Sequence, residues 1–286
     1  MRAPRRLALV FLFLIGCDSA LSPGEAPPEA TRGLPEWFAP NFIIEPRSAT
    51  KPVINGREIV FRVNRGDCST VTDARGPSDC ARRTTRSAVT TGSTWNLGEQ
   101  YLLSFEFWID PKLRHRAYSN PRAVQTNRRS SRLSIARWYG DRRPDNQLFD
   151  LKVDATRGVT FLGRTCIPPS QFGKWHRFDM RVRWSKGNAG FLEVRCHGNL
   201  YTGAPIYMRT NFPTNQPLHC FRENNCRPNV PTSPSSFEMQ LGIIFDAEVA
   251  NGRRVFPRIG RDGLTIRMRR VVERELFVIF GMEGAS

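Results

Sequence analysis

The feature that most constrains the fold is a two-residue alternation of apolar and polar side chains that recurs along the chain. In residues 178–184 (FDMRVRW) apolar and charged residues alternate without a break. The same period recurs in four further segments, at 59–63, 103–109, 237–245 and 264–268. Successive side chains of a β-strand point to opposite faces of its sheet, so each segment predicts a strand with one buried and one solvated face.

Turn-forming residues separate these segments. Gly and Asn occur together at 187–188, 198–199 and 251–252, and no long stretch has apolar residues at helical spacing. Many strands, polar turns and no helix–strand alternation favour antiparallel sheets packed face to face. We therefore expect an all-β sandwich of the jelly-roll or concanavalin-like type, forming a single domain over residues 37–286.

The N-terminal segment indicates export. Arg2, Arg5 and Arg6 precede an apolar run at 7–15 that is too short to span a bilayer, which is the layout of a secretory signal. The run ends in Gly16-Cys17, which resembles a bacterial lipobox, so residues 1–17 are interpreted as a signal peptide and Cys17 as a lipidation site.

An ordinary signal peptide cleaved near Ala20 is the alternative, and in either case the mature chain leaves the cytoplasm. Residues 18–36 are rich in Pro, Gly, Ala and Glu and predict a flexible tether. The expected location is the periplasm or the outer surface of a bacterium, with a lipid anchor as the only contact with a membrane.

The remaining cysteines number six and predict disulfides, because export places them in an oxidising compartment. They are Cys68, Cys80, Cys166, Cys196, Cys220 and Cys226. Proximity in sequence suggests pairing of the first two and of the last two, which leaves the middle two as the third pair. No CxxC motif and no His/Asp/Glu cluster with metal spacing occurs, so no metal site and no cofactor are expected. A structural calcium ion remains open.

The charge balance indicates an acidic partner. The chain carries 43 Lys and Arg against 26 Asp and Glu, a formal net charge of +17. Such a field attracts polyanions, and export disfavours nucleic acid as the partner. Acidic polysaccharide, lipopolysaccharide and anionic lipid headgroups are then the available partners. The alternative is a charge adapted to solubility without a specific ligand. A monomer is expected.

Arginines occupy the solvated positions of two predicted strands, at Arg181, Arg183, Arg267 and Arg269. A guanidinium group binds carboxylates and sulfates through two parallel hydrogen bonds. Arg181 and Arg183 are therefore candidate substrate-binding residues for an acidic glycan. The alternative is a solvated face with dispersed charge.

Three segments resemble the heparin-lyase-I-like polysaccharide lyases, a family of jelly-roll enzymes. Residues 61–68 (FRVNRGDC) with 85–88 (TRSA) resemble the family's first strand, Gly-Asp segment and Arg-Ser-Glu motif. Residues 173–185 (GKWHRFDMRVRWS) are similar to its Gly-x-Trp-His strand pair, and 190–199 match the following hairpin. Residues 240–244 (QLGII) lie where the family has Lys-x-Gly-x-Tyr. The resemblance spans about residues 58 to 270.

The resemblance implies cleavage of a uronate-containing glycan by β-elimination. That reaction needs groups that neutralise the uronate carboxylate, a base for the proton at C5 and an acid for the departing O4. Arg86 and Arg137 are the candidates for neutralising the carboxylate, with Gln240 as a hydrogen-bond donor. Tyr139 is the candidate base and acid if neighbouring arginines lower its pKa. The alternative is that Tyr139 is an aromatic platform for a sugar ring or part of the core. His115, in an Arg-rich loop, is a further candidate base.

Several positions differ from the family pattern. Arg137 and Tyr139 lie where the family has Gln and His, Gln240 replaces Lys, and Ile244 replaces Tyr. Ala88 lies where the Arg-Ser-Glu motif has Glu. An envelope lipoprotein that binds an anionic glycan without cleaving it is therefore the alternative function. His176, in the Trp-His pair, is expected to be structural.

Overall fold

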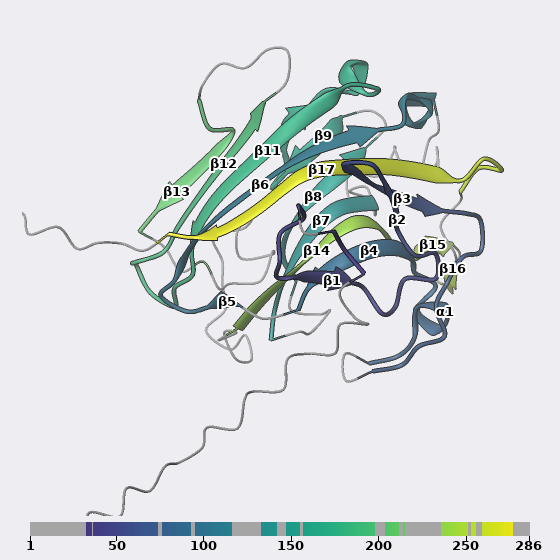
Figure 1. Ribbon diagram of the computed structural model, residues 1–286, viewed down its shortest axis with the longest axis horizontal. Helices are drawn as coiled ribbons and strands as arrows, with labels where there is room; N and C mark the ends of the chain where they lie inside the picture. Colours follow the sequence, from purple (N-terminus) through teal and green to yellow (C-terminus); the bar gives the residue numbers. More distant parts are fainter. Residues whose placement is uncertain are drawn as a thin grey trace, which may run out of the picture.

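The computed structural model describes residues 33–35, 37–73, 76–92, 95–115, 133–141, 147–154, 157–197, 204–211, 214, 236–250, 253–255 and 259–276. These residues form two antiparallel sheets packed face to face, as the alternation predicts (Figure 1). The jelly-roll-type sandwich expected from the sequence is confirmed. Each sheet has an inner face toward its partner and an outer face away from it.

The eight-stranded sheet carries the candidate catalytic strands at its centre. In spatial order its strands are β1 (Phe42–Ile44), β4 (Thr85–Thr91), β14 (Ser236–Phe245), β7 (Leu133–Gly140), β8 (Gln147–Asp154), β9 (Gly158–Phe161) and β10 (Arg164–Ile167), with β5 (Trp95–Asn96) paired to one end of β14.

The seven-stranded sheet forms the other layer. Its order is β13 (Tyr207–Thr210), β12 (Phe191–His197), β11 (Trp175–Arg183), β6 (Gln100–Ile109), β17 (Leu264–Glu275), β3 (Glu58–Val63) and β2 (Val53–Asn55). The remaining described elements are a small hairpin of β15 (Glu248–Ala250) and β16 (Arg253–Val255), the short helix α1 (Asp79–Arg82), and 3-10 turns at Pro111–His115 and Pro169–Gln171. No helix that the structure describes is long and apolar enough to cross a bilayer.

The core lies between the inner faces and is rich in aromatic side chains. Trp184 stacks on Phe237 with ring centroids 4.0 Å apart. The ring centroids of Trp138 in β7 and Phe178 in β11 are 6.1 Å apart, so these two side chains pack against each other across the core between the sheets. The five alternating segments of the sequence supply the inner residues of β3, β6, β11, β14 and β17. Offset and edge contacts of this kind add to the stabilisation from apolar burial.

The two outer faces differ in exposure. Along β11 buried residues alternate with exposed or half-buried ones, as expected for a solvated outer face. Every residue of β4 and β7, and all of β14 except its first, is buried. The outer face of the eight-stranded sheet is therefore also shielded from solvent along its central strands.

Gly242 lies where two backbones and a ring approach closely. A Cβ atom at this position would lie 2.4 Å from the Ser87 carbonyl oxygen and 2.6 Å from the Phe61 ring, and the backbone φ is +128°. Only glycine tolerates that conformation without strain. The pairing of β14 with β7 is irregular directly after this point, between Leu241 and Ile244.

Two disulfides lie in the described part of the chain and confirm two of the predicted pairings. Cys68–Cys80 closes the loop that leads into α1, and the two cysteines are 12 positions apart in sequence. Cys166–Cys196 joins β10 of the eight-stranded sheet to β12 of the seven-stranded sheet. The predicted pair Cys220–Cys226 lies outside the described residues, as do Cys17 and the rest of residues 1–32.

The double variant Cys166→Ser/Cys196→Ser tests the link between the sheets. The two cysteines are 30 residues apart, and closing a loop of that length restricts the unfolded chain by about 3–4 kcal/mol. We expect the free energy of unfolding, measured by urea denaturation, to fall by that amount with the sandwich retained. An unchanged midpoint in the double variant would show that the link does not stabilise the fold.

Candidate functional site

Four of the residues singled out in the sequence lie together on the outer face of the eight-stranded sheet. Gln240 of β14 is paired in register with Arg137 of β7. The Arg86 side chain of β4, on the other side of β14, lies with its Nη1 atom 3.4 Å from Gln240 Oε1. Tyr139 has its hydroxyl 3.5 Å from Arg137 Nη1. Strand parity therefore gathers residues that are far apart in sequence.

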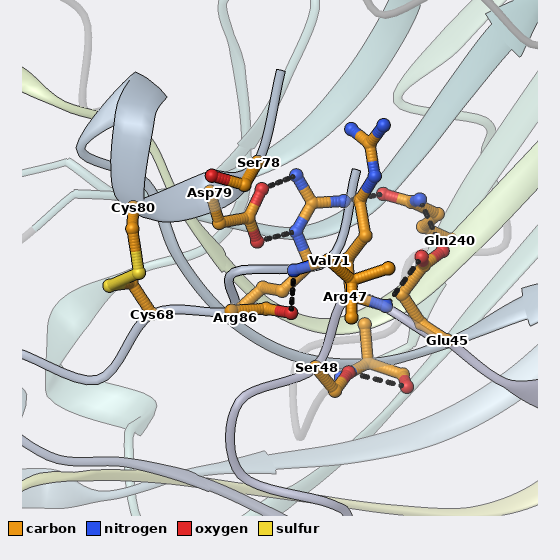
Figure 2. Close-up of polar contacts among 12 residues, drawn as sticks. Glu45, Arg47, Ser48, Cys68, Val71, Ser78, Asp79, Cys80, Arg86 and Gln240 are labelled. Atoms are coloured by element: carbon orange, nitrogen blue, oxygen red, sulfur yellow. Dashed lines mark hydrogen bonds and ion pairs between the residues drawn. A yellow bond between two sulfur atoms is a disulfide. The ribbon is translucent and has the colours of Figure 1, made fainter. Parts of the chain in front are cut away.

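Arg86 is held by a buried carboxylate from α1. Its Nε and Nη2 atoms donate to Asp79 Oδ2 and Oδ1 at 2.6 and 2.8 Å. Asp79 follows the helix cap Ser78, whose hydroxyl accepts a hydrogen bond from the Ala81 amide. Burial raises the pKa of the Asp79 carboxyl, and Arg86 acts against that shift. The Cys68–Cys80 disulfide anchors the residue that follows Asp79 (Figure 2).

Gln240 is fixed at both ends of its amide. Its Nε2 atom donates to Glu45 Oε2 at 2.7 Å, while its Oε1 atom faces Arg86. The backbone amide of Arg47 donates to the other carboxylate oxygen of Glu45 at 3.2 Å. Figure 2 shows Glu45 and Gln240 pointing toward each other. The amide therefore bridges a buried guanidinium group and a buried carboxylate.

Arg137 forms a bidentate pair with Asp246, the residue directly after β14. Arg137 Nη1 and Nη2 donate to Asp246 Oδ1 and Oδ2 at 2.9 and 2.5 Å. The Arg137 side chain is 6% exposed, whereas that of Asp246 is 43% exposed. Burial has the largest single effect and acts to raise the pKa of Asp246, but the charge and hydrogen bonds of Arg137, together with the charges of Arg86 and Lys152, lower that pKa overall. The carboxylate thus occupies the solvent side of a buried guanidinium group.

Further polar residues of β7 and β8 hold the Arg137 side chain in place. Its Nε atom donates to Ser134 Oγ at 3.1 Å, and Ser134 donates to Asp150 Oδ2 at 3.1 Å. Asp150 lies 3.5 Å from Lys152 Nζ. The guanidinium group is consequently held at three of its nitrogen atoms, and its orientation is fixed.

Tyr139 differs from the sequence expectation in its ionisation. Burial raises the pKa of the Tyr139 phenol above its usual value, and this effect exceeds the lowering by Arg137 and Arg86. The expectation of a lowered pKa was wrong because it counted neighbouring charge and not desolvation. At neutral pH the phenol is therefore protonated, which suits it to donate a proton rather than to accept one.

The face is also less cationic than the sequence suggests. Arg47 pairs with Asp73, Arg86 with Asp79 and Arg137 with Asp246, and Glu45 lies beside Gln240. Such one-to-one pairing is what burial requires of charged groups. The arginines expected from the sequence to bind a substrate carboxylate, Arg86 and Arg137, are thus already paired with carboxylates of this chain.

Other predicted site residues lie elsewhere. Arg181 and Arg183 project from β11 on the outer face of the seven-stranded sheet, on the opposite side of the sandwich from Arg86 and Arg137. His115 ends the 3-10 turn Pro111–His115, and its side chain lies outside the described part of the chain. His176 is buried, and its Nε2 atom lies 2.8 Å from the Gln171 carbonyl oxygen, in agreement with a structural role.

Three carboxylates at this site, Glu45, Asp79 and Asp246, were not predicted from the sequence. The sequence gives weak grounds for two of them, because Asp246 directly follows a long apolar strand and Asp79 follows a Ser that can cap a helix. No feature of the sequence around Glu45 points to a role at this site. Among the described residues, no group of three or more His, Cys, Asp and Glu side chains is arranged to hold a metal ion.

Comparison with known proteins gives structural neighbours alone. No protein-family model matches the chain, and no curated protein matches it. An alginate lyase from Corynebacterium sp. is 11% identical with a TM-score of 0.47, covering 86% of this chain and 92% of that one. An endo-β-1,4-glucuronan lyase from the fungus Trichoderma reesei is 12% identical with a TM-score of 0.41, covering 81% and 86%.

A carbohydrate recognition domain, that of Emp47p, is similar to the same degree. It is 10% identical with a TM-score of 0.39, covering 85% of this chain and 90% of that one. At such identities and TM-scores no residue role carries over from these proteins, so the roles of residues here rest on the contacts of this chain.

The pairing of Arg137 with Asp246 predicts a specific pH dependence of stability. The folded-state pKa of Asp246 is lowered, so the pair stabilises the fold above the unfolded-state pKa of about 4 and this contribution is lost as the pH falls through the folded-state pKa. We expect Asp246→Asn to lower the free energy of unfolding at pH 7 by about 1–3 kcal/mol, less than for a fully buried pair because Asp246 is partly exposed.

Urea denaturation at pH 7 and pH 3 provides the measurement. The difference between the wild type and Asp246→Asn should shrink at the lower pH, and Asp262→Asn, at an exposed position, serves as the control. A difference of the same size at both pH values would contradict the lowered pKa.

Proposed function

We propose that this protein is a polysaccharide lyase that cleaves an anionic, uronate-containing glycan by β-elimination on the outer face of the eight-stranded sheet. The observation that carries the proposal is the convergence of Arg86, Arg137, Tyr139 and Gln240 on three neighbouring strands. A guanidinium group able to bind a carboxylate, beside a phenol able to donate a proton, supports the proposal, because the reaction requires both kinds of group.

Arg137 is the proposed binding site for the uronate carboxylate. It already holds a carboxylate in bidentate geometry, and that carboxylate, Asp246, belongs to a partly exposed side chain. A substrate carboxylate that replaces Asp246 restores the same two hydrogen bonds and leaves no buried charge unpaired. Arg86 stays paired with Asp79 and contributes positive potential.

Proton transfer is assigned to Tyr139 and Asp246. The buried phenol of Tyr139 is protonated and adjacent to Arg137, so it donates its proton to O4 as the C4–O4 bond breaks. Asp246, once separated from Arg137, loses the charge that lowered its pKa and becomes the stronger base that accepts the C5 proton. The product carries a double bond between C4 and C5.

Binding without cleavage is the second candidate function, and the ion pairs favour it. Both arginines hold internal carboxylates, so a glycan must compete for Arg137 before any reaction begins. If the glycan carboxylate does not displace Asp246 from Arg137, the protein would bind the acidic glycan without cleaving it.

The proposed place of action is outside the cytoplasm, with the chain anchored through Cys17 as a monomer. Two disulfides among the described residues support an oxidising compartment. Acidic polysaccharides of the cell surface or surroundings are then the available substrates, and no cofactor is invoked.

Tyr139→Phe tests the proposed proton donor. Removal of a general acid typically lowers the rate by a factor of about 10² to 10⁴, so we expect such a loss of cleavage with glycan affinity retained. Purified protein is supplied with glucuronan, alginate, heparin or hyaluronan, and the ultraviolet absorbance of the unsaturated uronate is followed together with binding.

Tyr207→Phe is the matched control, because Tyr207 is a half-buried tyrosine of β13 in the other sheet. Binding of a glycan by the wild type without a rise in absorbance would replace the lyase proposal with the binding one. Cleavage that survives in Tyr139→Phe at the wild-type rate would remove Tyr139 from the mechanism.

A further inference from the structure

The outer face of the seven-stranded sheet concentrates arginine. The adjacent strands β3, β17, β6, β11 and β12 all contribute charged residues to it. We call this surface the arginine face. Its cations are Arg62, Arg177, Arg181, Arg183, Arg195, Arg267, Arg269, Arg270 and Arg274, and its carboxylates among the described residues are Glu58, Glu106, Asp179 and Glu193. The face has a clear excess of positive charge.

Ion pairs within the face leave that excess in place. Glu193 is shared by Arg181 and Arg195, at 3.5 and 2.6 Å. Glu106 is shared by Arg269 and Arg270, at 2.6 and 2.7 Å. Asp179 and Glu58 each pair with one arginine, Arg177 and Arg267, at 2.9 and 3.8 Å. Four carboxylates therefore leave most of the arginine charge of the face unneutralised, so a net positive potential extends into solvent.

Aromatic rings orient several of these arginines. The Arg267 guanidinium lies 4.5 Å from the centre of the Trp108 ring, and that of Arg269 lies 4.1 Å from the centre of the Trp175 ring. Stacking engages the flat side of a guanidinium group and leaves N–H edges for phosphate or carboxylate oxygens. Tryptophan and arginine are also typical of protein surfaces at the bilayer interface.

Exposed apolar side chains lie at both margins of the same face. Val53 of β2 and Met208 of β13 are each 63% exposed. Val53 is paired with Val60, and Met208 is paired with Glu193, whose side chain lies on the arginine face. The basic centre therefore lies between two apolar edges.

The distribution of charge favours a surface over a single chain as the partner. Neighbouring strands lie about 4.8 Å apart, so five strands spread the arginines over a width of about 20 Å. A single polysaccharide strand occupies a line across such a sheet, whereas a bilayer covers the whole area. Phosphate headgroups match the guanidinium edges, and the acyl boundary matches Val53 and Met208.

We propose that the arginine face docks onto an anionic phospholipid bilayer through lipid phosphate groups, which revises the expectation that the lipid anchor is the only contact with a membrane. Because the two outer faces of a sandwich point in opposite directions, this orientation turns the Arg137 site away from the membrane. The proposal does not depend on cleavage at that site, and the two proposals are tested by separate measurements.

Hydroxyl-radical footprinting of the full chain tests the contact. Vesicles of phosphatidylcholine alone are compared with vesicles that also contain phosphatidylglycerol, and oxidation of Trp108, Trp175 and Met208 is quantified by mass spectrometry. We expect protection of these residues on anionic vesicles only, and its loss at high salt. Oxidation is measured at individual residues, so attachment of the chain to the vesicle through its N-terminal segment alone does not protect Trp108, Trp175 or Met208.

Charge reversal supplies the matched comparison. In Arg177→Glu/Arg181→Glu/Arg270→Glu, three strongly exposed members of the face are altered, and the anionic lipid needed for half protection should rise by about two orders of magnitude or more. The control Arg83→Glu/Arg157→Glu/Arg164→Glu changes the net charge equally at exposed positions beside α1 and strands β9 and β10 of the eight-stranded sheet, and it should retain wild-type protection.

Three results would overturn the proposal. One is equal oxidation on neutral and anionic vesicles, and another is an equal loss of protection in both triple variants, which would indicate net charge alone. The third is protection of the same residues by soluble alginate but not by vesicles, which would make the face a polysaccharide-binding surface.

Discussion

Burial of the central strands of the eight-stranded sheet on both faces is the constraint on which the candidate site depends. A charged side chain shielded from water is tolerated only when it is paired and hydrogen-bonded. Arg86 and Arg137 satisfy this requirement through Asp79 and Asp246, and Gln240 satisfies it through Glu45. The carboxylates are therefore a condition for arginines at these positions, whatever ligand they bind.

The same burial determines which chemistry the site can support. A phenol beside two arginines in water would ionise more readily, but desolvation of Tyr139 has the larger effect and raises its pKa. The site consequently holds a protonated acid next to an occupied carboxylate-binding group. Catalysis from this arrangement requires exchange of one carboxylate for another at Arg137, and the partial exposure of Asp246 makes it the partner that can be displaced.

The sequence predicted the sandwich because period-two alternation is a local property, and the inner residues of β3, β6, β11, β14 and β17 follow it. The candidates Arg137, Tyr139 and Gln240, named for β-elimination, also lie together on one face of the sheet. Ion pairing could not be predicted, since Glu45 and Gln240 are far apart in sequence and meet only through sheet order. For the same reason Arg181 and Arg183 appeared equivalent to Arg86, although they belong to the other layer.

Arginine therefore has a different role on each outer face, and the difference follows from how exposed the arginine side chains are to solvent. Where the guanidinium group is buried, each arginine acquires its own carboxylate, as at Arg86 and Arg137. On the solvated face Glu106 and Glu193 each serve two arginines, because solvent screens the remaining charge at little cost. Asp179 and Glu58 there each pair with a single arginine. The long-range positive field of the described sandwich thus arises mainly from the arginine face, whereas the proposed selectivity for a carboxylate is assigned to the buried Arg137 site.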